Sequence, residues 1–279
     1  MTAASVSAIM VSWQTGPVLL DGLNSLIADP DIAEIILVDH ENPEGLRAKI
    51  DQLAGTHDKL TVIRTNENLG FAKGCNLGAV QASSAHLFFI NPDARPESGA
   101  VNALLAALKD QPQTAIAGAR ILDANGKEQS GSRRRELTLW RAIATFTGLA
   151  ALGLAKPFGR EKDSVPAAPV QVDAISGAGF AIQKAGFDAL GGFDEAYFLH
   201  VEDIDLCRRA ERVWFVPEAI VHHVGATSAA SPMAVEWAKA QSFVRYFWKF
   251  DETLLGRAAT IIVAPFLTLA ILARAVLKN

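Results

Sequence analysis

Short apolar runs alternate with amphipathic stretches along the first 122 residues of the chain. The apolar runs predict strands at residues 6–13, 34–40, 59–65, 86–92 and 115–122. The stretches between them predict helices at residues 17–28, 43–54, 71–83 and 97–110. Strands separated by helices of about a dozen residues are typical of right-handed βαβ units. The fold class that we expect is therefore α/β, with a mostly parallel sheet flanked by helices.

Three of the predicted strands end in residues that suit ligand binding. They are followed by Ser12-Trp13, Asp39-His40 and Asn91-Pro92-Asp93. Parallel strands bring their carboxyl ends to one edge of a sheet, and ligands of α/β proteins bind beyond that edge. We expect these three segments to lie on one rim.

The pattern changes after residue 122. Residues 123–136 are polar and form a plausible connector, and residues 170–183 predict one or two strands. Residues 193–210 predict a loop that enters a helix, and residues 212–224 predict paired strands. This second part of the chain therefore differs in organisation from the first.

These patterns suggest two domains. Residues 1–230 would form one domain, with a first half at about 1–122 and a second half at about 123–230. Residues 231–279 would form C-terminal helices that associate with a membrane.

Two long uncharged segments bear on that membrane association. They cover residues 142–155 and 258–273, and the second lies between Arg257 and Arg274. Its sixteen residues fall short of the roughly 20 that span a bilayer upright. Three interpretations stay open: two buried helices, attachment to a membrane surface helped by basic residues such as Lys278, and a true span.

Composition and charge exclude several classes of protein. The net charge of −4 argues against a partner bound through overall basicity, so we expect no nucleic acid partner. Two cysteines exclude a disulfide scaffold and a four-thiolate zinc site. No basic region precedes the first apolar run, so we expect a cytoplasmic protein, peripheral at the inner face of the cell membrane.

The Asn91-Pro92-Asp93 segment is the first candidate for chemistry. A carboxylate directly after a buried strand can hold a divalent cation against a phosphate. The structural alternative is a turn or a helix cap.

A second candidate is the acidic segment at residues 202–205. Glu202, Asp203 and Asp205 lie within one helical turn, and aromatic residues precede them. A carboxylate in an apolar pocket is a candidate general base, because desolvation raises its pKa. Favourable placement of acids at a helix N-terminus explains the same charges without catalysis.

Two further segments complete the candidates. His222 and His223 follow each other in a strand, so only one of them can face a given site, as a cation ligand or as a packed side chain. The segment NLGFAKGCNLGAV at 68–80 has neither a Walker A nor a GxGxxG pattern. Its glycines and Lys73, at a helix N-terminus, suit the close approach of a nucleotide.

Taken together, several segments resemble one enzyme family. They are VSW (11–13), LVDH (37–40), NLGFAKGCNLGA (68–79), FINPDARP (89–96), the long segment at 176–210 that includes GGFDE and EDIDLCRR, and VPEAIVHHVGATS (216–228). They resemble the family 2 glycosyltransferases, inverting enzymes of the GT-A fold, and more narrowly their rhamnosyltransferase-like branch. The resemblance spans about residues 5–230. It implies that residues 1–230 are a GT-A glycosyltransferase domain, with a nucleotide-binding half at about 1–122 and an acceptor-side half at about 123–230.

The resemblance implies roles for individual residues. The site for a nucleoside-diphosphate sugar donor would contain Val11, Ser12, Trp13, Asp39, Asn68, Gly70, Lys73, Asn91 and Asp93. Asp93 would hold Mg²⁺ or Mn²⁺ on the diphosphate, and His222 would lie near the metal, with His223 leaving the register open by one. Asp203 would be the catalytic base, supported by Glu202.

The resemblance also has departures. His40-Glu41-Asn42-Pro43 replaces the frequent acidic-Asn-Ser turn, and Asn91 stands where many relatives carry Asp. Cys75 occupies a position often filled by Asn. The presumed base and Asp93 are both present.

The implied function is transfer of a sugar, with L-rhamnose suggested by the branch. The donor would be dTDP- or UDP-linked, and the acceptor would be lipid-linked or a polysaccharide. The alternatives are a sugar nucleotidyltransferase, a glycoside hydrolase that uses Asp93 and Asp203 as paired carboxylates, and a catalytically silent relative that binds nucleotide sugar.

Overall fold

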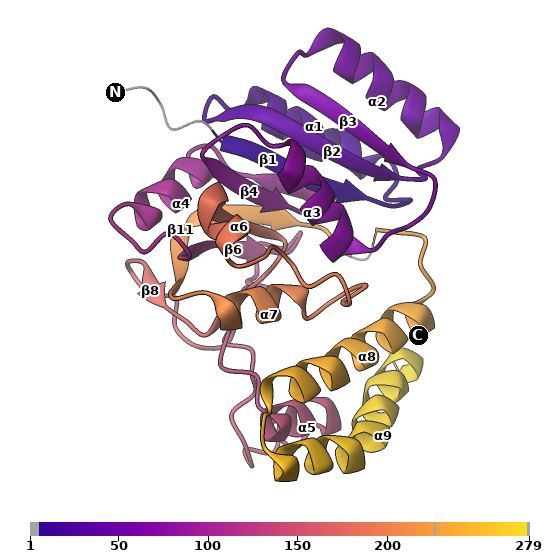
Figure 1. The fold of residues 1–279 in the computed structure, drawn as a ribbon, viewed down its shortest axis with the longest axis vertical. Coiled ribbons are helices and arrows are strands. Elements are labelled where there is room, and N and C mark those ends of the chain that lie inside the picture. The colour runs from indigo at the N-terminus through magenta and orange to yellow at the C-terminus, as the bar shows by residue number, and fades with distance from the viewer. Residues whose placement is uncertain (1–5, 226, 278–279) are drawn as a thin grey trace.

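The computed structural model describes residues 6–225 and 227–277, with side chains up to residue 273 (Figure 1). Lys278 and the side chain of Arg274, considered above, therefore lie outside the described residues. A sheet domain fills one end of the molecule, and a layer of helices from the C-terminal part of the chain lies at the other (Figure 1).

The sheet has nine strands, in the order β3-β2-β1-β4-β10-β6-β11-β5, with β8 beside β11. Their bounds are Leu60–Thr65, Ile32–His40, Val6–Ser12, His86–Ile90, Gly179–Gln183, Ile116–Leu122, Val213–His223, Ala94–Pro96 and, for β8, Val170–Gln171. The strands β3, β2, β1, β4, β6 and β11 run in one direction, and β10, β5 and β8 oppose them. The sheet is thus mixed, and its first four strands are parallel, as the alternating pattern predicts.

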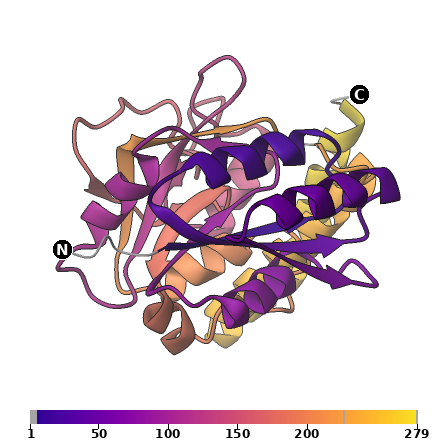
Figure 2. The same ribbon diagram turned by 90° about the horizontal axis from the view of Figure 1, so that it is seen from above.

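Helices cover both faces of this sheet (Figure 2). Alternate residues of β1 face opposite sides: Ala8 and Met10 pack with α1 (Val18–Ala28), α2 (Glu44–Thr56) and α4 (Ala100–Leu108). Ile9 and Val11 belong to the other core, with α3 (Phe71–Gln81), α6 (Lys184–Ala189) and α7 (Glu202–Arg209). Burial on both faces explains the continuous apolar strands.

Two glycines let α3 lie directly against β1. A Cβ on Gly74 would come within 2.7 Å of Val11 Cγ1, and one on Gly78 within 2.7 Å of Ile9 Cγ2. Larger residues there would push the helix away from the sheet. This close packing fixes the start of α3 beside the carboxyl end of β1.

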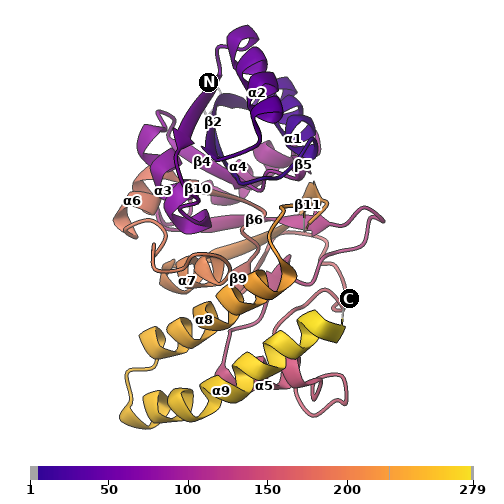
Figure 3. The ribbon, with the colours of Figure 1, turned by 90° about the vertical axis from the view of Figure 1, so that its right-hand side faces the viewer.

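The helical layer is built from two separate parts of the chain. It contains α5 (Leu139–Thr147), α8 (Pro232–Phe250) and α9 (Leu254–Leu277), which lie side by side below the sheet domain (Figure 3). Phe146 of α5 and Phe243 of α8 meet edge to face at 5.1 Å. The strands of a small second sheet, β7 (Arg133–Arg134) and β9 (Ala174–Ile175), lie before and after α5 along the chain.

The structure corrects three predictions in the second part of the chain. Residues 212–224 do not form paired strands but one strand, β11, whose register shifts between Val216 and Ile220. Pro217 lies in this shift, and proline cannot donate to a strand ladder. Residues 170–183 hold three short strands instead of one or two. The apolar segment at 142–155 is helical only as far as Thr147, because Gly148 ends α5 with a φ of 84°.

Candidate active site

The ends of β1 and β2 form one corner of the predicted rim. Ser12 pairs with Asp39 in the parallel register, and Asn42 connects them. The Asn42 side-chain amide donates to Ser12 Oγ at 2.8 Å and to Asp39 Oδ1 at 2.8 Å. Trp13 is half-buried at the end of β1, whereas Val11 is buried under α3.

Asp39 is completely buried and has only protein partners. Its Oδ2 accepts hydrogen bonds from Nε of Arg47 at 3.0 Å and of Arg64 at 3.4 Å. The place in the donor site that the resemblance implies for Asp39 stays a prediction. This carboxylate organises the turn after β2 and holds two arginines, and it does not project into open space.

The loop before α3 contacts a distant part of the chain. Asn68 Oδ1 accepts a hydrogen bond from the Gly70 N–H at 3.0 Å, which tightens the loop. Gly70 has a φ of 83°, and a Cβ there would lie 2.6 Å from the Phe198 carbonyl oxygen. Phe71 N–H donates to that same carbonyl at 3.0 Å. Lys73, one helical turn further on, is exposed.

Asp93, at the end of β4, faces His223. His223 Nε2 lies 3.1 Å from Asp93 Oδ1, while Asp93 Oδ2 accepts from Gly225 N–H at 2.9 Å and from Thr227 Oγ1 at 3.0 Å. Burial raises the pKa of the Asp93 carboxyl, but the hydrogen bonds from His223 and Thr227 outweigh burial, so that this pKa lies below its usual value. Asp93 is therefore a buried carboxylate in its charged form.

The partners of His223 define which of its nitrogens carries a proton. Gln129 Nε2 donates to the His223 carbonyl at 2.7 Å, so Gln129 Oε1 faces Nδ1, at 2.9 Å. Nδ1 is then the donor to Gln129, and Nε2 faces Asp93 Oδ1 and the Asn91 side chain.

These donor atoms fit a divalent cation. A carboxylate oxygen, an imidazole nitrogen with an oriented outer partner and the nearby Asn91 side chain, whose Nδ2 lies 3.1 Å from His223 Nε2, are ligand types of Mg²⁺ and Mn²⁺ sites. Residues 6–225 and 227–277 hold no group of three or more His, Cys, Asp or Glu side chains gathered as ligands. Most of the coordination shell of such an ion would come from the ligand.

His222 is not the histidine at this site. Its Nε2 lies 2.7 Å from Glu97 Oε1, and its side chain is 39% exposed. In the antiparallel register with β5, His222 pairs with Arg95 and His223 with Ala94. Successive strand residues point to opposite faces, so the register places His223, not His222, beside Asp93.

Asp203 is held by Arg134 and by backbone groups. Arg134 Nη1 lies 2.9 Å from Asp203 Oδ2 and also donates to the Ile175 carbonyl at 2.6 Å. Gly177 N–H donates to the same Asp203 oxygen at 2.9 Å. The Asp203 side chain is only 9% exposed, so it is a fixed carboxylate with a positive partner.

The neighbouring Glu202 differs from Asp203 in its hydrogen bonding and has a raised pKa. It is 6% exposed, and its Oε2 has no hydrogen-bond partner among the described residues. Burial, and next the charge of Asp203, raise the pKa of Glu202 to about 8. Glu202 therefore keeps its proton at neutral pH, next to the carboxyl group that Arg134 pairs.

The backbone is strained directly before this pair. His200 has a φ of 66° and Val201 a φ of 71°, in the left-handed region that a β-branched residue rarely adopts. Strain of this kind persists only where surrounding contacts fix it, and it clusters at functional sites. Val201 is buried, so its packing contributes to holding the turn.

One short segment connects the two acidic sites. The N–H of Asn91 donates to the Ala178 carbonyl at 3.3 Å, and the N–H of the adjacent Gly177 donates to Asp203. The Asp93 turn and the Asp203 carboxylate therefore lie on either side of residues 176–178. The structure brings together residues that are 110 positions apart in sequence.

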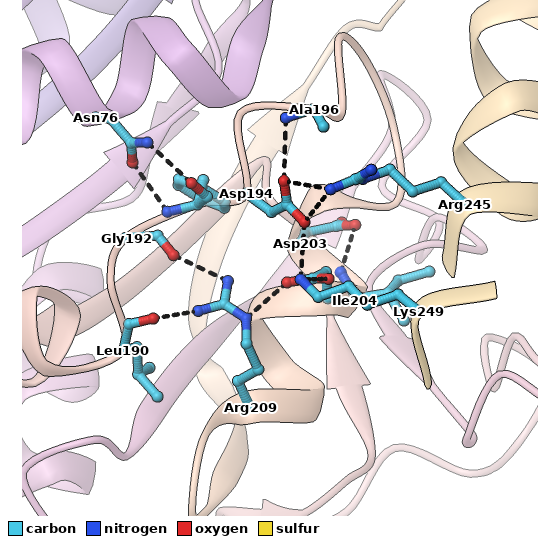
Figure 4. Close-up of polar contacts among 12 residues, drawn as sticks. Asn76, Leu190, Gly192, Asp194, Ala196, Asp203, Ile204, Arg209, Arg245 and Lys249 are labelled. Carbon is cyan, nitrogen blue, oxygen red and sulfur yellow. Dashed lines mark hydrogen bonds and ion pairs between the residues drawn. The ribbon is translucent and has the colours of Figure 1, made fainter. Parts of the chain in front are cut away.

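A polar network ties this region to α3 and to α8 (Figure 4). Asn76 of α3 exchanges two hydrogen bonds of 2.9 Å with the backbone of Phe193. Asp194 contacts Arg245 and Lys249 of α8 at 2.8 Å each. Lys249 also reaches Asp205 of α7 at 2.6 Å. The network brings the NLGFAKGCN and GGFDE segments into contact.

Residues 7–161 match the sequence profile described as "Glycosyl transferase family 2", which is more than half of the chain. The chain belongs to glycosyl transferase family 2. This glycosyltransferase is 24% identical over 249 residues to an N-acetylglucosaminyl-diphospho-decaprenol L-rhamnosyltransferase of Mycobacterium tuberculosis, covering 80% of this chain and 78% of that relative. It is 25% identical over 185 residues to the low-salt glycan biosynthesis hexosyltransferase Agl10 of Haloferax volcanii, covering 65% and 54%.

Solved structures of the same fold include sugar transferases. A mannosyltransferase of Pyrobaculum calidifontis in complex with GDP-Man and Mn²⁺ matches with a TM-score of 0.60 and 16% identity, covering 98% of this chain and 74% of that chain. GalNAc-T7 with UDP, GalNAc and Mn²⁺ matches with a TM-score of 0.61 and 18% identity, and the match covers 89% of this chain and 49% of that chain. The glycosyltransferase therefore has the expected GT-A fold and is a rhamnosyltransferase-like member of its family.

Proposed function

We propose that this glycosyltransferase moves a sugar, with L-rhamnose the first candidate, from a nucleoside-diphosphate donor to a lipid-linked or polysaccharide acceptor, with inversion. The observation that carries the proposal is the Asp203 carboxylate, fixed by Arg134 and Gly177 and separated from Asp93 by one short segment. The printed names of the mycobacterial and archaeal relatives support the substrate classes.

The proposed reaction is a single displacement. The acceptor hydroxyl oxygen forms a bond to the anomeric carbon while the bond from that carbon to the donor diphosphate breaks. Asp203 takes the hydroxyl proton, which makes it the general base. Glu202 is protonated below about pH 8 and cannot take that proton, so its supporting role is to donate a hydrogen bond. One attack from the side opposite the leaving group inverts the configuration.

Asp93, His223 and Asn91 would hold a divalent cation, Mg²⁺ or Mn²⁺. When bound, the cation would offset the negative charge of the leaving diphosphate. His223 takes this position instead of the predicted His222, because its Nε2 faces Asp93. Relatives of the same fold solved with Mn²⁺ support a metal-assisted reaction.

The rest of the donor site would come from the rim and from the start of α3. Trp13 and Lys73 have accessible side chains, and we propose that they contact the nucleotide. Ser12 and Asp39 would act indirectly by fixing the Asn42 turn. Asn68 and Gly70 would shape the loop that approaches the donor.

We further propose that α9 attaches the enzyme to the surface of a membrane. The segment Leu254–Ala273 is apolar and long enough to cross a membrane by length and composition. However, Leu267 and Ile271 are buried in the core with α5 and α8, and α8 is tied to Asp194 by charged side chains. A face with Ile262, Phe266 and Leu269, each at least 65% exposed, is left for lipid.

A thermal-shift panel tests the donor site. The purified chain is heated with UDP-, GDP- and dTDP-sugars, each with and without Mn²⁺. A donor at 100 times its Kd adds about 2.7 kcal/mol of stability, so a metal-dependent shift with one nucleotide family is expected. A shift without turnover on any lipid-linked acceptor would instead support the silent relative, and no shift with any donor would contradict the proposed function.

A further inference from the structure

A cavity of about 270 Å³ lies next to the proposed base, on the side of the helical layer. Its walls include Glu202 and Asp203 from the start of α7, Thr145 and Phe146 from α5, and Phe243 from α8. The cavity is therefore bounded both by the sheet domain and by the helices α5 and α8 of the helical layer.

One wall of this cavity is aromatic. Phe146 and Phe158 each meet Phe243 edge to face, at 5.1 Å and 6.3 Å between ring centroids. Apolar C–H groups of a sugar ring pack favourably against aromatic surfaces, because they shed water there at no cost in hydrogen bonds. This wall suits one face of a pyranose.

The other wall is polar but carries no net charge. Arg134 is paired with Asp203, and Lys239 is paired with Glu236 at 2.7 Å. Glu202 is the remaining acid, and burial and the charge of Asp203 hold it in its neutral form, as described above. A wall of balanced charges gives a diphosphate no excess of positive charge, whereas it offers donors and acceptors to hydroxyl groups.

Two buried polar atoms in this wall have no partner among the described residues. They are Oε2 of Glu202 and Nε2 of His200. Burial lowers the pKa of His200 to about 3, so its imidazole is neutral. Each of these atoms has almost no accessible surface of its own, so they make the wall polar but do not themselves contact a ligand.

We propose that this cavity is the subsite for the acceptor sugar, and that it takes one uncharged pyranose residue between the aromatic wall and the Glu202–Asp203 wall. This inference rests on the proposed function. It adds that the acceptor group is an uncharged sugar ring and that helices α5 and α8 help to bind it. A volume of about 270 Å³ is at the low end of ligand pockets, which fits one ring and not an oligosaccharide. A hydroxyl of a ring held here would face Asp203. Helices α5 and α8 thus belong to the active site.

The test uses a cavity-filling variant and a matched control on the same helix. Thr145→Phe places a ring in the cavity, whereas Thr147→Phe adds the same ring at an exposed position two residues later. Ligand-observed NMR measures binding of uncharged methyl glycosides of glucose, galactose, N-acetylglucosamine and rhamnose, with inorganic diphosphate as the charged probe. We expect glycoside binding to the full chain and to Thr147→Phe, and at least about tenfold weaker binding to Thr145→Phe.

Two results would overturn the proposal. The first is equal glycoside binding by Thr145→Phe and Thr147→Phe. The second is a Thr145→Phe variant that loses diphosphate binding but keeps glycoside binding. Should Thr145→Phe fail to fold by circular dichroism, Phe243→Leu removes the aromatic face while keeping most of the volume, and the same loss is expected. The donor-dependent thermal shift is measured on every variant. A normal donor shift with unchanged glycoside binding would reject only the subsite, whereas absence of a donor shift in the unaltered chain would reject the proposed function itself.

Discussion

Arg134 Nη1 lies 2.9 Å from Asp203 Oδ2, although the two residues are 69 positions apart in the chain. Both side chains are largely buried, at 13% and 9% exposed. A buried carboxylate without its positive partner is costly, so this pair holds Asp203 in one orientation next to the cavity. Arg134 is therefore a positioning residue for the proposed base.

We predict that Arg134→Lys lowers kcat by about 10²-fold, because lysine keeps the charge but cannot reproduce the geometry of the guanidinium at Asp203 and Ile175. Donor binding, measured by thermal shift, should be unchanged. Arg135→Lys is the matched control, since Arg135 forms its ion pair with Asp163. Equal kcat values for the two variants would show that Arg134 does not position the base.

The two adjacent histidines make a second controlled comparison. His223→Gln should weaken metal-dependent donor binding by about tenfold or more, because Nε2 faces Asp93. His222→Gln should leave it unchanged, because His222 contacts Glu97 on the opposite face. Titration of Mn²⁺ at fixed donor concentration measures both. A larger effect for His222→Gln would restore the original sequence prediction.

Glu202 should make folding stability depend on pH. Its pKa in the folded protein, about 8, is above its ordinary value of 4.5, so the folded state binds this proton more tightly. The stability it contributes is fully present below pH 4.5 and is lost as pH rises to about 8, by at most about 1.4 kcal/mol per pH unit for one proton.

Urea unfolding of the unaltered chain and of Glu202→Gln between pH 6.5 and 8 measures this effect. Asp203, Arg134 and Asp205 are the charged groups that act on Glu202, and neutral His200 affects stability only below this range. The unaltered chain should lose stability relative to Glu202→Gln as pH rises through this range, because only glutamate can ionise. A difference independent of pH would mean that Glu202 is ionised throughout.

The exposed face of α9 should control membrane binding. Phe266→Glu removes a large apolar side chain from the proposed lipid contact, and burial of such a side chain is worth about 1.5–3 kcal/mol. Sedimentation with anionic vesicles should fall by about tenfold or more. Val80→Glu, at an exposed position of α3 in the catalytic domain, is the control. If both variants bind vesicles as the unaltered chain does, α9 is not the attachment.

The sequence pattern predicts the position of a residue when that position follows from the hydrophobic periodicity of a single strand or helix. The parallel strands at the N-terminus end where their apolar runs end, so the rim formed by Ser12, Asp39 and Asp93 was accessible to prediction. The helix at Glu202 was accessible for the same reason, because an acidic start followed by arginines is a local signal.

The remaining features depend on contacts between distant segments. Arg134 reaches Asp203 only because β7 pairs with β9, a two-residue pairing with no periodic signal. His223, and not His222, faces Asp93 because the strand shifts its register around Pro217. The sequence does not show where such a shift occurs. In the helical layer, α5 packs with α8 and α9, although α5 comes before the predicted boundary at residue 231 and the other two helices come after it. A boundary in the sequence does not show this packing.

Transfer of sugar in a single turnover by Asp203→Asn tests the central claim most directly. Asparagine keeps the size of the side chain but cannot accept the proton, so the rate should fall by about 10²–10⁴-fold while donor binding persists. Glu202→Gln, the neighbouring buried carboxyl, should lose less than about tenfold, because it is already protonated. A rate for Asp203→Asn equal to that of the unaltered enzyme would contradict the assignment of Asp203 as the base.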